Sequence, residues 1–312
     1  MSTALIWFRH DLRLRDNAAL TAASKHASQL LPLYIHDPES ESPWQRGSAS
    51  RWWLHHSLIA LNSTLEKQGT QLILRCGNSI EHLKELAHTT GADRIFINRR
   101  YEPHLAVYDA RCAEQLNRVG IEVLQYSGAL LTEPESLRKE DGTPYRVFTP
   151  FWKAFQSQPS IGEPLPAPSV LSPLPEAVDS IAIGSLGLLP RNAWTAGLET
   201  RWHTGEISAQ RRLQEFLDAQ LENYGSNRDL PGIAGTSALS PHLAFGEISP
   251  RDIWFAVQDA AANNVLRVPA TEFLRQLVWR EFAYHILHHH PDTTDQPLDV
   301  RFERFSWAAE SD

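Results

Sequence analysis

The chain has 312 residues, of which 42% are hydrophobic and 21% are charged. This composition excludes a disordered protein and allows one large or two ordinary domains. The first apolar run is interrupted by charges from Arg9 onward, and no stretch has the length of a membrane span, so we expect neither a secretory signal nor membrane contact. The net charge of -8 opposes a generally basic surface for nucleic acid, although it leaves room for a local basic groove.

The cysteine content also limits the class of protein. Cys76 and Cys112 are the two cysteines, and their spacing fits neither a disulfide framework nor a zinc site. The run His288–His290 has no acidic partner at ligand spacing, so a solvated helix end is the simpler interpretation. We therefore expect a cytoplasmic protein without a bound metal.

The first ~130 residues alternate short apolar runs with helical patterns, as strand-helix-strand units do. Strands are predicted at Thr3–Phe8, Leu30–His36, Gln71–Arg75, Arg94–Asn98 and Glu122–Tyr126. Helices are predicted to begin near Asp16, Ser48, Ser79 and Pro103. This alternation indicates a doubly wound α/β domain over residues 1–130, built on a parallel five-stranded sheet.

Ligands of such sheets bind beyond the carboxyl ends of the strands, so the loop Arg9–Asp16 after the first strand is a candidate site. The loop has no G-x-G-x-x-G and no G-x-x-x-x-G-K-S/T sequence. The phosphate-binding glycines of dinucleotide folds and P-loop enzymes are therefore missing. ATP pyrophosphatases are disfavoured for the related reason that no glycine-serine phosphate loop follows this strand.

The pattern changes after the α/β domain. Residues 131–206 are predicted to form an extended proline-rich connection, with seven prolines between residues 157 and 204. Residues 207–312 then have a helical pattern. Its predicted helices are Ile207–Asn223, two short ones opened by Ser240-Pro241 and Ser249-Pro250, and a long one over Thr271–His290.

A loop rich in hydroxyl groups precedes one of these helices. Ser240 is predicted to be the N-cap and Pro241 the first helical residue, which would direct free N–H groups toward Thr236 and Ser237. Such a helix end can bind a phosphate or diphosphate. Ordinary helix capping is the alternative.

Tyr224 and Arg228 are four residues apart, which would place a phenol and a guanidinium on one helix face. The pair could bind phosphates of a cofactor or of DNA. Alternatively, Arg228 forms a surface salt bridge with Asp229 or Glu222.

The long predicted helix carries aromatic and polar residues together on one face. Phe273, Gln276 and Arg280 share a face, with Trp279 beside it. An amide, an indole and a guanidinium on an otherwise apolar helix would suit a pocket for a planar base. The alternative is a buried helix in which Arg280 is paired with a glutamate.

Five motifs, in this order along both domains, resemble the DNA photolyase and cryptochrome flavoprotein family, and in particular the bacterial class I photolyases of cyclobutane pyrimidine dimers. They are Trp7-Phe8-Arg9-His10-Asp11-Leu12-Arg13-Leu14-Arg15-Asp16-Asn17, Pro144-Tyr145-Arg146-Val147-Phe148-Thr149-Pro150-Phe151, Gly235-Thr236-Ser237-Ala238-Leu239-Ser240, Gly246-Glu247-Ile248-Ser249-Pro250 and Trp279-Arg280-Glu281-Phe282.

The resemblance implies a Rossmann-like antenna domain followed by an all-helical domain that binds FAD. A further chromophore, either methenyltetrahydrofolate or a deazaflavin, would occupy the antenna domain. The implied flavin contacts are the diphosphate positions and one ring position: Tyr224, Thr236, Ser237, Ala238, Leu239, Ser240 and Phe273.

The resemblance further implies damaged DNA as the partner of a monomeric protein. Excited reduced flavin would pass an electron to a pyrimidine dimer, which splits and returns it. The implied DNA-facing positions are Arg228, Gln276, Trp279, Arg280 and Ala283, with Trp279 stacking on the lesion and Gln276 hydrogen-bonding to it. Trp307 matches the outermost tryptophan of the photoreduction chain.

Two features of the sequence keep alternatives open. Gln276 replaces the glutamate common in photolyases of cyclobutane dimers and resembles the 6-4 photolyase and cryptochrome branches, so a blue-light sensor is one alternative. The chain ends five residues after Trp307, without the later helices of the family. We therefore expect an incomplete helical domain with weakened FAD binding, and a non-catalytic antenna-domain fragment is the other alternative.

Overall fold

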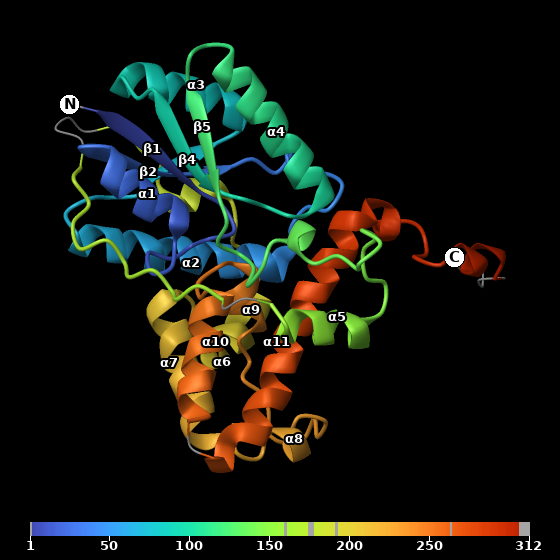
Figure 1. Ribbon diagram of the computed structural model, residues 1–312. Coiled ribbons are helices and arrows are strands. Elements are labelled where there is room, and N and C mark those ends of the chain that lie inside the picture. Colours follow the sequence, from blue (N-terminus) through green and yellow to red (C-terminus); the bar gives the residue numbers. More distant parts are fainter. Residues whose placement is uncertain (1, 159–160, 174–177, 191–192, 263, 306–312) are drawn as a thin grey trace.

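The computed structural model describes residues 2–158, 161–173, 178–190, 193–262 and 264–305. Trp307, the predicted photoreduction tryptophan, lies outside the described residues. An α/β domain packs against a helical domain, and a long connection runs between them (Figure 1). None of the helices in the described ranges is long and apolar enough to cross a membrane.

The α/β domain contains a five-stranded parallel sheet in the order β3-β2-β1-β4-β5, which confirms the predicted fold class. The strands are β1 (Thr3–Phe8), β2 (Gln29–His36), β3 (Ile73–Cys76), β4 (Arg94–Asn98) and β5 (Glu122–Tyr126). Three of the five predicted ranges are matched at both ends, and β2 and β3 are shifted by one or two residues.

Helices cover both faces of this sheet. They are α1 (Ala18–His26), α2 (Ser48–Lys67), α3 (Ser79–Thr90) and α4 (Pro103–Asn117). Along β1, Ile6 and Phe8 pack with α1 and α2, whereas Leu5 and Trp7 pack with α3 and α4. Because both faces are buried, the strand has a continuous apolar sequence instead of an alternating one.

The helical domain has its own core. Its helices are α7 (Glu206–Ala219), α8 (Tyr224–Asn227), α9 (Ser240–Ala244), α10 (Pro250–Ala260) and α11 (Arg267–His289). Phe216 of α7, Ile253 of α10 and Val278 of α11 are fully buried in this cluster. The predicted all-helical character of this part is therefore present in the described residues.

The predicted extended connection is wrong in part, because residues 131–206 include two helices, α5 (Phe148–Gln156) and α6 (Ala196–Arg201). Phe151 and Phe155 of α5 are buried in the core of the helical domain. The aromatic residues of α5 recur on one face, and burying that face stabilises a helix inside a proline-rich segment.

Several helix boundaries also differ from the prediction. α1 begins at Ala18, because the side chain of Asn17 accepts a hydrogen bond from the Leu20 N–H at 3.0 Å and caps the helix. α11 begins at Arg267, four residues early, and accommodates Pro269 in its first turn, where no N–H donor is needed. α7 ends at Ala219 instead of Asn223.

Buried polar contacts join the two domains. The Arg13 guanidinium donates to the carbonyl oxygens of Gly246 at 3.0 Å and Gly128 at 2.7 Å. Gly246 has φ +66°, and a Cβ there would lie 2.1 Å from the His10 carbonyl oxygen. Only glycine allows this approach. The Arg9–Asp16 loop thus forms part of the domain interface.

Candidate functional site

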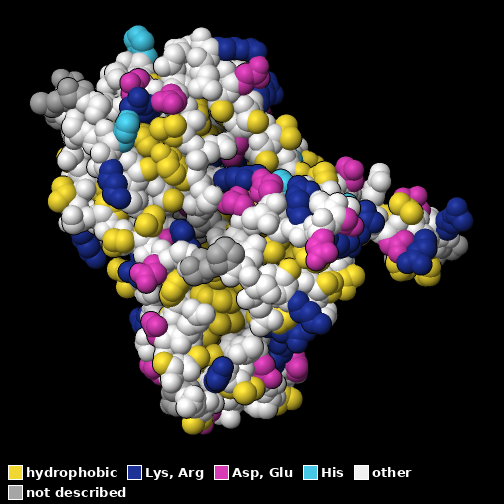
Figure 2. Space-filling view, viewed as in Figure 1, with side chains coloured by type: hydrophobic (Ala, Val, Ile, Leu, Met, Phe, Trp, Pro, Cys, Tyr) yellow, Lys and Arg dark blue, Asp and Glu magenta, His cyan; other side chains and the backbone are white. Residues whose placement is uncertain are grey.

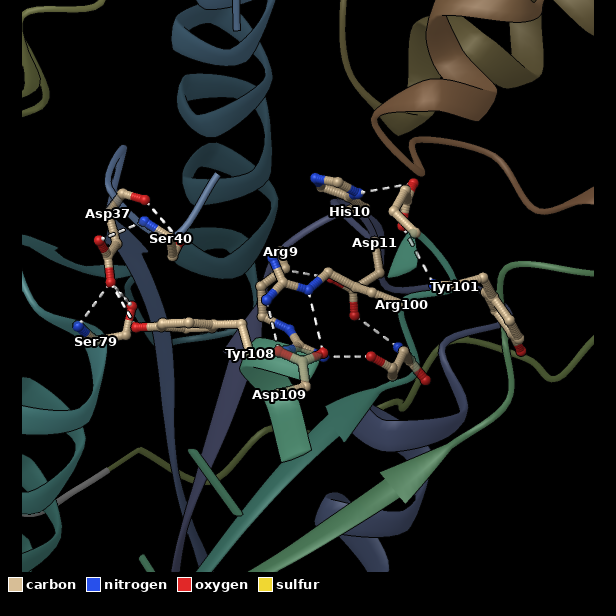
Figure 3. Close-up of polar contacts among 12 residues, drawn as sticks. Arg9, His10, Asp11, Asp37, Ser40, Ser79, Arg100, Tyr101, Tyr108 and Asp109 are labelled. Atoms are coloured by element: carbon tan, nitrogen blue, oxygen red, sulfur yellow. Dashed lines mark hydrogen bonds and ion pairs between the residues drawn. The ribbon is translucent and has the colours of Figure 1, made fainter. Parts of the chain in front are cut away.

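The strand order reverses between β1 and β4, and the residues that follow these strands form a buried polar cluster (Figure 3). Arg9 donates to Asp109 at 3.0 Å, and Arg100 donates to the same carboxylate oxygen at 2.5 Å. The Asn98 amide donates to Asp11 at 2.6 Å. These charges are therefore paired with one another in the interior.

Burial shapes the ionisation of this cluster. Burial lowers the pKa of Arg9. Burial alone would raise the pKa of Asp109, but the guanidiniums of Arg9 and Arg100 hold it below its ordinary value. Removing one member of such a buried ionic group leaves an uncompensated buried charge, which is strongly destabilising.

The crevice at this switch point is nearly closed. A cavity of about 30 Å³ is left between residues after β1 and β4 and residues of the helical domain, among them His10, Tyr101, Leu243 and Arg280. This volume accommodates little more than one water molecule. The Arg9–Asp16 loop therefore offers no open ligand site in this conformation, because its charged side chains are used inside the protein.

A larger cavity of about 450 Å³ lies beside it, where β2 and β3 end. Asp37 on its wall accepts hydrogen bonds from the Tyr108 hydroxyl at 2.7 Å and the Ser79 hydroxyl at 2.8 Å, and from the Ser40 N–H at 3.2 Å (Figure 3). Burial raises the pKa of Tyr108, and the hydrogen bond to Asp37 raises it further, so the phenol stays protonated. This cavity is open and polar.

The predicted anion-binding loop of the helical domain carries unpaired donors. Within the described residues, the backbone N–H groups of Thr236, Ser237 and Ala238 make no hydrogen bond. Ala238 has φ +51°, a left-handed conformation that helps successive N–H groups to converge. Arg212 instead binds the carbonyl oxygens of Ser237 at 2.8 Å and Thr236 at 3.3 Å, which fixes the loop from its other side.

The predicted capping by Ser240 is wrong. α9 begins at Ser240 itself, its N-cap residue is Leu239, and no side chain caps it. The Leu239 N–H is turned back to the Ser237 hydroxyl at 3.4 Å. Because α9 has only five residues, its dipole is short, and the donors of the preceding loop are the stronger argument for an anion site.

The predicted flavin contacts Tyr224 and Phe273 are both buried in the helical core. Their rings meet edge to face with centroids 5.3 Å apart, and Phe216 packs on both. Arg228 lies one turn after Tyr224, as the spacing predicted, with its guanidinium 5.8 Å from that ring. Arg228 also contacts Asp229 at 3.3 Å, so the salt bridge named as the alternative is present.

The predicted DNA-facing residues of α11 lie in different environments. Trp279 remains 43% exposed, and one face of its indole stacks on Phe148 at a centroid distance of 3.6 Å. Gln276 is half-buried and Ala283 is exposed. Arg280 differs, because it donates to the Ala129 carbonyl oxygen at 2.8 Å and lines the closed crevice between the domains. Arg280 also contacts the Glu281 carboxylate at 3.3 Å, so the glutamate pairing named as the alternative is present, and the DNA-facing role of Arg280 stays a prediction.

Two residues of α11 were missed as site candidates. Glu281 is buried, accepts from the Leu131 N–H at 2.8 Å, and burial raises its pKa to about 7. His285 accepts from the Tyr145 N–H at 3.1 Å, and burial lowers its pKa to about 4. The sequence signal that could have identified both residues is a glutamate and a histidine four residues apart on an otherwise apolar stripe of the helix.

Surface charge and metal-binding groups add little to the site. Positive and negative side chains are interspersed over the face drawn in Figure 2, so this face is no basic platform for DNA. Among the residues that the structure describes, no group of three or more histidine, cysteine, aspartate or glutamate side chains could hold a metal ion.

A parallel α/β domain joined to a helical domain with a donor-rich loop defines a two-domain protein with a candidate anion site. The family model for DNA photolyase matches residues 4–169, more than half of the chain. The chain is 39% identical over 304 residues to a deoxyribodipyrimidine photo-lyase of Agrobacterium fabrum, covering 97% of this chain and 63% of that protein. It is 34% identical to cryptochrome-2 of Arabidopsis thaliana, covering 99% of this chain and 52% of that protein.

A crystal structure of a bacterial class III photolyase from Agrobacterium tumefaciens superimposes with a TM-score of 0.92 at 38% identity, covering 99% of this chain and 63% of that one. The chain belongs to the DNA photolyase family. It spans less than two thirds of the length of these relatives. The expected similarity to class I is not matched, since this similar structure is a class III photolyase.

Proposed function

We propose that this protein binds FAD and acts in the light-driven repair of pyrimidine dimers in DNA. The observation that carries the proposal is the set of unpaired N–H donors at Thr236, Ser237 and Ala238, which fits the charge and geometry of a diphosphate. When bound, FAD would supply the electron that splits the dimer and receive it back afterwards.

The side chains of this protein would bind and orient the lesion. The Trp279 indole stacks on Phe148, and its exposed part could stack on a base that is flipped out of the DNA duplex. The Gln276 carboxamide can both donate and accept a hydrogen bond at a base edge. Arg228, already near the surface, would contact a phosphate. Family membership and similarity to photo-lyases support these roles.

Tyr224 and Phe273 would have a supporting role in the flavin site. Both are buried against each other, so their exposed edges alone could touch a flavin. Their packing holds α8 against α11 and thereby places the neighbouring Arg228. The antenna chromophore, methenyltetrahydrofolate or a deazaflavin, stays a prediction, and the cavity beside Asp37 is large enough to be tested for it.

The test begins with flavin. The purified chain, reconstituted with FAD and desalted, is expected to keep a flavin absorbance band. Irradiated with an oligonucleotide that carries one defined lesion, it should repair that lesion only in the light. Parallel substrates with a cyclobutane dimer or a 6-4 product identify the lesion. A chain that keeps no FAD, or keeps FAD and repairs neither lesion, overturns the proposal.

A variant separates the lesion contact from the flavin site. Trp279→Ala is expected to lower the repair rate by at least about tenfold with unchanged flavin content, because one base-stacking contact is lost. The matched control is Trp44→Ala, since Trp44 is also exposed but lies between β2 and α2. Equal effects of the two changes would contradict the role of Trp279.

Gln276 supports a second candidate, a cryptochrome-type blue-light sensor. Such a protein would keep the flavin and change its absorbance reversibly in blue light, with no repair of either lesion. A monomer is predicted in both cases and is checked by light scattering during size-exclusion chromatography.

A further inference from the structure

A cavity of about 510 Å³ lies where the residues that follow α6 meet α7 and α9. Arg212 of α7 lines this cavity and binds the carbonyl oxygens of Thr236 and Ser237. In a trans peptide the C=O and the N–H point in opposite directions, so the N–H groups of Ser237 and Ala238 point away from Arg212. Ala238 borders the cavity, but these two donors, which are proposed for the flavin diphosphate, face the other side of the loop.

The lining of this cavity is basic, although the whole chain has a net charge of -8. Its charged residues are three arginines, Arg201, Arg211 and Arg212, and one glutamate, Glu215, which leaves a net charge of +2. Arg211 is exposed and lies 3.8 Å from Glu215, a surface pairing that contributes little. The guanidinium of Arg201 makes no hydrogen bond or ion pair with the described residues. Two of the three arginines are therefore available to an anion.

A buried histidine faces the same cavity. His242 of α9 lines it, although this residue is only 2% exposed. Its Nδ1 donates to the Glu247 carboxylate, which also accepts from the Trp53 Nε1–H at 3.2 Å and the Gly205 N–H at 2.7 Å. Because the carboxylate is an acceptor, Nδ1 is the nitrogen that carries the proton. Glu247 thus fixes both the orientation of the ring and its tautomer.

The second ring nitrogen, Nε2, is the polar atom that His242 can offer to a ligand. Among the described residues, none forms a hydrogen bond with Nε2. A buried polar atom without a partner costs free energy, and a ligand that supplies the partner removes this cost. Nε2 accepts a hydrogen bond in the neutral ring and donates one in the imidazolium. Either form can bond to a phosphate, which has acceptor oxygens and, as a monoanion, a hydroxyl group.

We propose that this cavity binds a small aromatic phosphate monoester, with its ring against Trp202 and its phosphate between Arg211 and His242. Such a phosphate carries a charge of about -1.5 to -2 at pH 7, which matches the net charge of the lining, and arginine suits its oxygens as a bidentate donor. Trp202 is half-buried and meets Trp53 edge to face at a centroid distance of 5.4 Å, which fixes its ring. The volume lies within the range of small-molecule sites, about 300–1,000 Å³.

The binding test compares three probes that share a benzene ring: phenyl phosphate, benzoate and phenol. Each is titrated into the purified chain by calorimetry at pH 7 and low ionic strength. Phenyl phosphate is expected to bind saturably with a stoichiometry of one, at least about tenfold more tightly than benzoate, because it forms more charge-assisted hydrogen bonds. No saturable binding of phenyl phosphate at about 1 mM, or an equal affinity for benzoate or phenol, overturns the proposal.

Two variants locate the site. Arg211→Gln should weaken phenyl phosphate binding by at least about tenfold. Arg118→Gln is the matched control, because Arg118 is also exposed and pairs with a glutamate four residues away, and it should leave binding unchanged. His242→Asn keeps an amide donor for Glu247, removes Nε2 and should weaken binding by at least about fivefold. An affinity in either site variant equal to that of Arg118→Gln overturns the assignment to this cavity.

The proposal does not rest on the repair function. The affinity for phenyl phosphate should be the same with and without saturating FAD, because the donors proposed for the flavin face the other side of the loop. Competition between FAD and phenyl phosphate would overturn the assignment to a separate cavity. If the chain binds no FAD, the proposed repair function fails, and the titrations with phenyl phosphate still decide this proposal.

Discussion

The carboxyl edge of the sheet and the donor-rich loop of the helical domain use their polar groups in opposite ways. At the carboxyl edge of the sheet, Arg9, Arg100 and Asp109 are buried and satisfy one another. In the helical domain, the N–H groups of Thr236 and Ser237 are unpaired within the described residues. Paired buried charge holds a structure together, whereas unpaired accessible donors are available to a ligand. Motif residues near a switch point can therefore be structural.

The largest expected effect comes from breaking the buried cluster. Asp109→Asn leaves Arg9 and Arg100 without a carboxylate and should lower the free energy of unfolding by about 3–5 kcal/mol. Glu114→Gln is the matched control, because Glu114 is also on α4 but pairs with Arg118 in solvent. Such an exposed ion pair contributes about 0–1 kcal/mol to the free energy of unfolding. Urea unfolding of both variants measures the difference. Similar losses would show that the cluster is not specially stabilising.

Glu281 should make stability depend on pH. Its pKa of about 7 in the folded protein exceeds its ordinary value of 4.5, so the protonated carboxyl favours the folded state. This contribution is complete below pH 4.5 and is lost as the pH rises through 7, a change of about 3 kcal/mol. Glu281→Gln should therefore gain stability relative to the natural chain between these pH values, measured by urea unfolding.

His285 provides the control of opposite sign. Its folded pKa of about 4 lies below the ordinary 6.5, so its contribution is present above pH 6.5 and is lost as the pH falls toward 4. His285→Gln should remove this loss of stability at low pH and leave unchanged the pH dependence of stability that Glu281 causes. If Glu281→Gln and His285→Gln shift the pH profile in the same direction, the assignments are wrong.

Two serine-proline helix starts offer a smaller and sharper test. Ser249 caps α10, accepting the Asp252 N–H at 2.9 Å, whereas Ser240 caps nothing. Ser249→Ala should lower the free energy of unfolding by about 1 kcal/mol. Ser240→Ala should stay within about 0.5 kcal/mol, as an exposed substitution does. Thermal unfolding compares them, and an equal cost would restore the capping role predicted for Ser240.

The smallest effect on stability is expected at Arg228. Arg228→Ala should leave unfolding nearly unchanged and weaken DNA binding for all sequences alike. The slope of log affinity against log salt concentration should decrease in magnitude by about one, because one phosphate contact is lost. Arg118→Ala, at the exposed arginine that directly follows α4, should leave that slope unchanged. Fluorescence anisotropy over a salt series measures it, and an unchanged slope for Arg228→Ala would remove this residue from the DNA interface.

Local pattern was sufficient for much of the fold. The apolar run Thr3–Phe8, which the charged Arg9 follows, predicted β1 at both ends, and Ser249-Pro250 predicted the start of α10. These features depend on neighbouring residues alone. The family resemblance also came from the sequence, because its motifs are contiguous. Helix α5 was missed, since its aromatic face becomes stable only against a core formed by later residues.

The sequence by itself determined the fold class, the family and the residues to consider as a site. Only the tertiary structure decided which of them are free to bind a ligand. Arg280 reaches the carbonyl oxygen of Ala129, 151 residues away, and Arg9 reaches Asp109, 100 residues away. Such pairings depend on how the domains pack and leave no trace in local spacing.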